Sequence, residues 1–154
     1  MSELLFLGTG AADWILEERN GFFRRNSAAL LDRKIMLDCG LHIFDFLEEY
    51  GNKELFENVT DILITHSHDD HYRKESVVKL AEKHKIRVAC DIFTKNDIGN
   101  HENIEFVNLK PFKEFDLDGY KIIPLLANHE MVCDEENLAC HYIIETSDGK
   151  KLFY

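Results

Sequence analysis

Ile62–Lys74, ILITHSHDDHYRK, contains three histidines and two aspartates within six residues, directly after an apolar run. Such a run predicts a buried strand that ends where the polar residues begin. His66 and His68 are two positions apart, so at a strand end both side chains point to the same face. Asp70 and His71 follow where the chain must turn. One short loop therefore offers two imidazoles to one point, and a carboxylate with an imidazole to a neighbouring point.

Imidazole nitrogens and carboxylate oxygens are ligands that zinc prefers, and manganese or iron also accepts this set. Two ions about 3.5 to 4 Å apart would hold a hydroxide and a substrate oxygen between them. The alternative is that these are solvated loop residues. Three histidines and an aspartate at this spacing after a strand favour a centre of one or two Zn²⁺ ions, with Mn²⁺ or Fe²⁺ as alternatives.

The stretch THSHDDH carries the pattern H-x-H-x-D-H and resembles the signature of the metallo-β-lactamase superfamily. FLGTGAA near the N-terminus, RRNSAALL and IMLDCG match the context of that signature. The resemblance implies an α+β fold, an αββα sandwich with metal ions at the upper edge of its two sheets. It also implies that His66 and His68 bind a first ion, while Asp70 and His71 bind a second. We assign Asp70 a catalytic role as well.

Two further residues enter through the same resemblance. The superfamily supplies a third histidine to the first ion after a later strand, and His129 in LLANHEMV stands in that position. Asp38 would orient the ligand loop, and its alternative role is that of a plain aspartate at the end of a hairpin. His141 lies in an apolar strand, which predicts a core histidine.

The rest of the chain predicts strands, hairpins and helices that frame this loop. Hydrophobic periodicity and turn residues indicate helices at 41–51 and 73–85. Asp118-Gly119 is typical of a tight hairpin turn. The predicted strands cover residues 4–7, 27–31, 35–37, 61–65, 86–90, 104–109, 113–117, 120–126, 138–146 and 151–154.

The length and composition of the chain indicate a single domain over residues 1–154. The chain is 154 residues long, 45% hydrophobic and 31% charged, which is ordinary for a soluble protein. No apolar run approaches the roughly 20 residues of a membrane span, and no secretory signal precedes Leu4, so we expect a cytoplasmic protein without a membrane partner. The four scattered cysteines are expected to be buried and unpaired.

The C-terminal side departs from the superfamily pattern. Beyond the third histidine the superfamily has a strand that ends in an aspartate bridging both ions, and later a last histidine. KKLFY at 150–154 resembles that strand, and the sequence stops there. We favour an incomplete domain, truncated on its C-terminal side, over a naturally short relative. The second ion should then be held weakly, and we expect self-association or pairing with the missing C-terminal segment.

The expected reaction is hydrolysis, in which a metal-bound hydroxide attacks an electrophilic carbonyl or phosphorus. LGTGAA and RRNSAALL resemble the branch with cyclic-phosphate phosphodiesterases and tRNA 3′-processing endonucleases. A net charge of −11 disfavours nucleic acid, so a small phosphodiester or cyclic phosphate is the expected substrate. Arg24, Arg25 and Ser27 are candidates to meet its phosphate. The alternatives are an inactive metal-binding fragment or subunit, and a lactonase or thioesterase.

Overall fold

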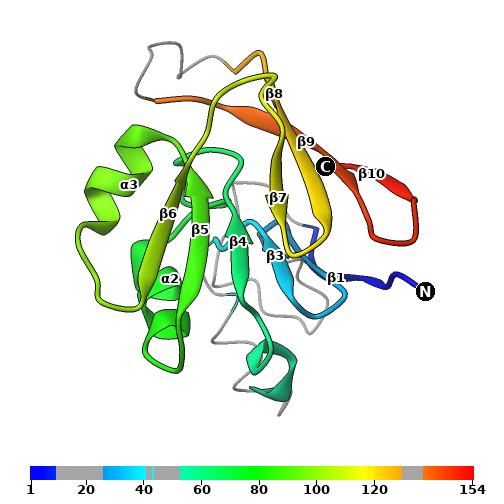
Figure 1. Cartoon of the computed structure of the whole chain (residues 1–154). Coiled ribbons are helices and arrows are strands. Elements are labelled where there is room, and N and C mark those ends of the chain that lie inside the picture. The colour runs from blue at the N-terminus through cyan, green and yellow to red at the C-terminus, as the bar shows by residue number, and fades with distance from the viewer. Residues whose placement is uncertain (10–25, 41–42, 44–52, 130–136) are drawn as a thin grey trace.

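Two β-sheets face each other in the computed structural model, which describes residues 1–9, 26–40, 43, 53–129 and 137–154 (Figure 1). The first sheet has six strands in the order β1-β2-β3-β4-β5-β6, and the second has four in the order β10-β9-β8-β7. None of the helices in these ranges is long and apolar enough to cross a membrane.

The first sheet is built in chain order and is mixed. It contains β1 (Leu4–Gly8), β2 (Ala28–Leu31), β3 (Ile35–Leu37), β4 (Asp61–Leu63), β5 (Ile86–Cys90) and β6 (Ile104–Asn108). The first three strands are antiparallel, and β3 to β6 run parallel. Every residue of β2, β3 and β4 is buried, because both faces of this sheet are covered.

The second sheet is an antiparallel meander in which inward and outward residues alternate. Its strands are β7 (Phe115–Leu117), β8 (Tyr120–Leu126), β9 (Cys140–Glu145) and β10 (Lys151–Phe153). Register is continuous from Lys121↔Glu145 to Leu126↔Cys140, and Asp118-Gly119 closes the β7–β8 hairpin as predicted. Residues at alternate positions of β9 turn inward, where Tyr142 and Ile144 are fully buried.

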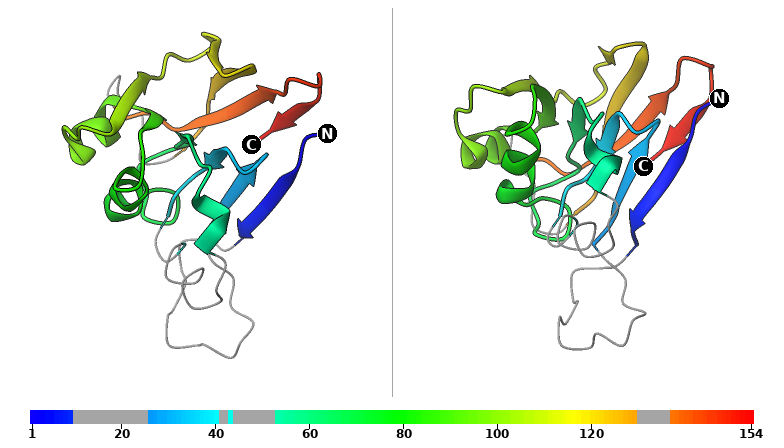
Figure 2. Two further views of the ribbon diagram at one scale, coloured as in Figure 1. Left: turned by 60° about the horizontal axis from the view of Figure 1, so that its bottom comes forward. Right: turned by 90° about the horizontal axis from the view of Figure 1, so that it is seen from below.

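Two cores fill the sandwich. One lies between the two sheets and includes Leu37, Leu63 and Ile122. The other lies under the helices and includes Met36, Ile62 and Leu80. Helices α2 (Lys74–Ala81) and α3 (Ile92–Ile98) cover one face of the first sheet, and the second sheet covers the other (Figures 1 and 2). A short 3₁₀ helix, η1 (Lys53–Phe56), precedes β4.

Several predicted boundaries were wrong. Helix α2 ends at Ala81 rather than at residue 85, because the chain tightens into a turn in which the Lys83 amide bonds to the Leu80 carbonyl. β4 ends at Leu63 rather than at Thr65. Helix α3 was not predicted, although Asp91 caps it with a 2.8 Å bond to the Thr94 amide. The helix predicted at 41–51 lies outside the described residues, apart from Ile43.

His141 is not a core histidine, so that prediction was wrong. It is exposed on the outward face of the second sheet, because the inward positions of β9 belong to its neighbours Cys140 and Tyr142. The outward face also carries Ile143 and Phe153, and the Phe153 ring lies 5.2 Å from that of His141. Neither α2 nor α3 packs on this face (Figure 2).

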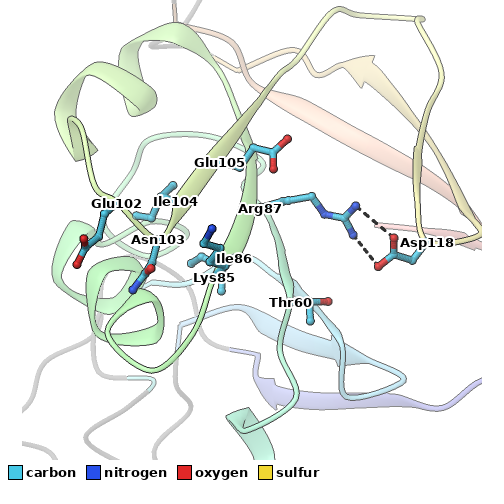
Figure 3. A pocket seen from close by; sticks show the side chains of 9 residues that line it. All are labelled: Thr60, Lys85, Ile86, Arg87, Glu102, Asn103, Ile104, Glu105 and Asp118. Carbon is cyan, nitrogen blue, oxygen red and sulfur yellow. Dashed lines mark hydrogen bonds and ion pairs between the residues drawn. The ribbon is translucent and has the colours of Figure 1, made fainter.

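A charged contact joins the sheets at the end where the parallel strands begin. Arg87 forms two bonds to the buried Asp61, at 2.6 and 3.0 Å, and a 2.9 Å ion pair to Asp118 in the β7–β8 turn. Figure 3 shows Arg87 and Asp118 facing each other beside a cavity of about 320 Å³. This cavity adjoins Thr60 and Ile86, at the starts of β4 and β5, and therefore lies away from the histidines that follow β4.

Candidate metal centre

The loop after β4 is anchored on both sides of the sandwich. From the second sheet, the Tyr142 hydroxyl donates to the Ile64 carbonyl at 2.5 Å, and the Cys140 amide donates to the Thr65 carbonyl at 2.8 Å. From the first sheet, the Cys39 amide donates to the His71 carbonyl at 2.7 Å. The loop is therefore held at its start and near its end, although it contains no regular secondary structure.

Four imidazoles meet at this edge of the sandwich. The His66 ring lies 4.8 Å from His68, 4.2 Å from His71 and 4.6 Å from His129, measured between ring centroids. Ligand atoms of His66, His68 and His129 lie within 4.8 Å of one another, and so do those of His66, Asp70 and His71. His66 thus belongs to both groups, whereas the sequence-based assignment placed it in the first alone.

Asp38 contacts His71 directly. Its carboxylate is fully buried, and Oδ2 lies 2.6 Å from His71 Nδ1. Because a carboxylate can only accept, His71 carries its proton on Nδ1 and turns Nε2 toward Asp70, whose Oδ2 is 3.4 Å away. Metal-binding histidines are commonly oriented by such a carboxylate. The Thr65 amide adds a 2.7 Å bond to Asp38 Oδ1.

Thr65 is a contributor that sequence reasoning missed. Its hydroxyl lies 2.9 Å from Asp38 Oδ2 and 3.0 Å from His66 Nδ1. The single hydroxyl proton goes to Asp38, so the oxygen accepts from His66 Nδ1, and His66 Nε2 carries a free lone pair. Its position directly before the first histidine was the only signal in the sequence.

The local electrostatics keep the key imidazole neutral. Burial lowers the pKa of His66 to about 3, and the neighbouring imidazoles of His71, His129 and His68 act in the same direction. Burial also opposes a charge on His71, but its bond and charge interaction with Asp38 outweigh this effect and raise the His71 pKa. Burial raises the pKa of Asp38.

The donor set fits a divalent metal ion. Imidazoles and a nearby carboxylate are the ligands that zinc takes in three-histidine and mixed sites. Two of these imidazoles, His66 and His71, are oriented through Nδ1. Candidate donor atoms of each group lie within 4.8 Å of one another, so small side-chain movements would let them reach one ion.

The neighbouring residues and the remaining predicted site residues have different surroundings. Asp69, which was not among the predicted ligands, is exposed and pairs with Arg73 at 3.4 Å. Ser27 lines a cavity of about 270 Å³ that also contacts His66, His71 and His129. Arg24 and Arg25 lie outside the described residues. Three cysteines, Cys39, Cys90 and Cys140, are buried and unpaired.

Several solved structures have the same fold as this chain. YhfI of Bacillus subtilis, a metallo-β-lactamase fold protein, is 15% identical with a TM-score of 0.68, covering 99% of this chain and 61% of that one. A PhnP-family diphosphatase is 15% identical with a TM-score of 0.65, over 94% and 62%. Yeast PDE1 is 13% identical with a TM-score of 0.66, over 99% and 64%. The chain thus spans about three fifths of the length of these proteins.

The fold and the His/Asp cluster together define a protein of the metallo-β-lactamase fold, as the resemblance implied. The family model described as "Anti-Pycsar protein Apyc1" matches residues 2–101, and the chain belongs to that family. No curated protein matches the sequence.

Proposed function

We propose that this chain belongs to a hydrolase that uses a divalent ion to cleave a small phosphodiester or cyclic phosphate. The observation that carries the proposal is the meeting of four imidazoles and Asp70, three of the imidazoles lining one cavity, with His71 held by the buried Asp38. His66 is buried and the other three imidazoles crowd it at its edge, and joint metal binding is the role that suits such a set.

Each residue then has a defined task. His66, His68 and His129 would hold one Zn²⁺, with Mn²⁺ or Fe²⁺ as alternatives, and Asp70 and His71 would hold a second. A bound ion supplies Lewis acidity and activates water. Asp38 keeps the proton of His71 on Nδ1, so that Nε2 stays available. Asp70, at the margin of the cluster, accepts the proton released by the attacking water.

The size and charge of the site support a small substrate. A cavity of about 270 Å³ lies just below the range for small-molecule sites, about 300 to 1,000 Å³, so it suits a small substrate. The net charge of −11 repels polyanions such as tRNA. Ser27 lines the same cavity and is our candidate to meet the substrate phosphate. The PhnP-family diphosphatase among the solved structures adds support for phosphate chemistry.

The second candidate function is metal binding without turnover. It is favoured by one observation, the span of about three fifths of the length of YhfI. In that case the residues of this chain would hold an ion, and catalysis would need groups that these 154 residues do not contain.

The test combines metal analysis with hydrolysis assays. The 154-residue chain, loaded with Zn²⁺ or Mn²⁺, is assayed on bis(p-nitrophenyl) phosphate, on a small cyclic phosphodiester, and on a lactone and a thioester. We expect phosphodiester turnover that His66→Ala abolishes and His101→Ala leaves unchanged. Stoichiometric metal without turnover would favour the second candidate, turnover of the lactone or thioester alone would favour that class, and a chain that binds no metal would refute both proposals.

A further inference from the structure

Tyr154 brings a hydroxyl from the second sheet to the buried carboxylate of the first. Its backbone continues the β9–β10 pairing. The Tyr154 amide donates to the Tyr142 carbonyl, and the Tyr142 amide donates to the backbone oxygen of Tyr154, both at 2.9 Å. This pairing directs the ring into the sandwich, where it lines the same cavity as His71. The hydroxyl lies 3.2 Å from Asp38 Oδ2 and 3.4 Å from the Leu37 carbonyl.

Asp38 is the better acceptor of these two. It is nearer and charged, and hydrogen bonds to a charged group are roughly twice as strong as neutral ones. Burial and the neighbouring carboxylate raise the pKa of Tyr154, so the phenol keeps its proton to donate.

The Tyr154 bond falls on the oxygen that also holds His71. Asp38 Oδ1 takes the Thr65 amide, whereas Oδ2 takes His71 Nδ1 at 2.6 Å, the Thr65 hydroxyl at 2.9 Å and the Tyr154 hydroxyl. The Tyr154 hydroxyl therefore adds a contact from the second sheet that limits rotation of the carboxylate about the Cβ–Cγ bond. Any such rotation would carry the His71 ring with it and move Nε2 relative to Asp70.

We propose that Tyr154 is a positioning residue of the metal centre, holding Asp38 so that Asp38 holds His71. The proposal rests on the metal centre put forward under Proposed function, and it assigns Tyr154 no contact with substrate or metal. Partners that orient metal-binding histidines typically change metal affinity by about 10- to 100-fold. Because Tyr154 acts one bond further away, we expect a loss of about 3- to 10-fold.

Tyr120 provides a matched control. Its hydroxyl also crosses between the sheets, but it donates to Asp32 Oδ2 at 2.6 Å, in the turn between β2 and β3 and away from the ligand loop. Tyr154→Phe and Tyr120→Phe therefore each remove one hydroxyl that bonds a carboxylate across the same interface. We expect both variants to lower the Tm, and only Tyr154→Phe to weaken Co²⁺ binding, measured against a chelator, and to alter the visible absorption of the Co²⁺ form.

A second readout does not depend on metal. In the metal-free protein, the His71 Nδ1–H proton that donates to Asp38 is observed by ¹⁵N-resolved NMR of the imidazoles. We expect Tyr154→Phe, but not Tyr120→Phe, to shift this resonance or to speed its exchange with water. Tyr154→Met, which also lacks the hydroxyl, replaces Tyr154→Phe if the latter does not fold.

The outcomes separate the two proposals. A wild-type chain that binds no Co²⁺ refutes the metal centre, while the His71 resonance still decides whether Tyr154 positions that ring. An unchanged His71 resonance in Tyr154→Phe overturns the inference, and so do Co²⁺ affinity and absorption equal to those of Tyr120→Phe.

Discussion

Gly40 determines how closely the ligand loop can approach the strand that carries Asp38. A Cβ atom built on Gly40 would lie 2.3 Å from the Asp70 carbonyl oxygen and 2.6 Å from its carbonyl carbon. Both neighbours are backbone atoms, which cannot turn aside. A side chain at position 40 therefore has to push the loop away, and Asp70 would move relative to the imidazoles.

We predict that Gly40→Ala weakens metal binding by at least about 10-fold and lowers the unfolding free energy by about 1 to 3 kcal/mol. Metal titration and urea denaturation of the same samples measure the two effects. Gly149→Ala is the control, because Gly149 has φ +78° and open space around it. It should cost about 1 kcal/mol through backbone strain while keeping the metal affinity. Equal metal affinity in Gly40→Ala and wild type would contradict this account.

At the residue scale, the sequence predicts contacts between residues that lie close together along the chain. His66, His68, Asp70 and His71 could be predicted to meet because they lie within six residues of one another, in a loop that turns directly after a strand. Contacts of Thr65 and Tyr154 with Asp38 could not, because they join positions 27 and 116 residues apart. Such contacts depend on how the two sheets face each other, which no local pattern encodes.

At the element scale, strands and hairpins with strong turn residues were predicted well, and the short helix α3 was missed. Seven residues are too few to display a helical period, and Ile92 and Phe93 remain exposed, so the apolar pattern is weak. Two signals were available. Asp91 stands at the N-cap and Gly99 adopts φ +75° after the last turn, as helix ends favour.

Two side-chain contacts hold the sheets together far from the imidazoles. The first is Arg87 with Asp61 and Asp118. We predict that Arg87→Ala lowers the unfolding free energy by about 3 to 5 kcal/mol, because it leaves the buried Asp61 carboxylate unpaired. Asp118→Asn, which removes the exposed partner, should cost less than about 1 kcal/mol. Denaturant unfolding measures both, and similar losses in the two variants would show that Asp61 does not need its partner.

The second contact is the Tyr120 hydroxyl, which donates to Asp32 Oδ2 at 2.6 Å. Burial, with added effects of Asp32, raises the pKa of Tyr120 to about 12. A raised pKa means that the folded chain keeps a proton that the unfolded chain has lost, so this contribution to stability is complete below pH 10 and disappears as pH rises toward 12. The unfolding free energy is expected to fall between pH 10 and 12. We predict that in Tyr120→Phe the slope of this fall against pH is smaller, by the amount that corresponds to about one proton. An unchanged slope would show that Tyr120 titrates alike in both states.

At the scale of the whole molecule, the described residues form three layers, with two helices on the first sheet and the second sheet behind it. The outward face of the second sheet has no helix over it among these residues, and it carries Ile123, Ile143 and Phe153. Phe153 is 62% exposed, at the edge strand of the sheet. Exposed apolar side chains beside a free strand edge favour association.

We predict that the 154-residue chain self-associates through this face. Sedimentation velocity should show a mass that rises with concentration, and Phe153→Lys should restore a monomer. Phe112→Lys is the control, because Phe112 is 69% exposed but lies in the loop before β7. A wild-type chain that keeps the mass of a monomer at every concentration tested would argue against this surface.

The order of strands in the first sheet also bears on how the protein is made. Because β1 to β6 are neighbours in the order of synthesis, the sheet that carries Asp38 and His66 to His71 can assemble as the nascent chain leaves the ribosome. His129 and Tyr154 arrive later, with the second sheet. Binding of an ion by all three histidines can therefore occur only late in synthesis. An ion bound there would link the first sheet, which forms early, to the second sheet, which forms late. It would close a loop of about 60 residues between His68 and His129.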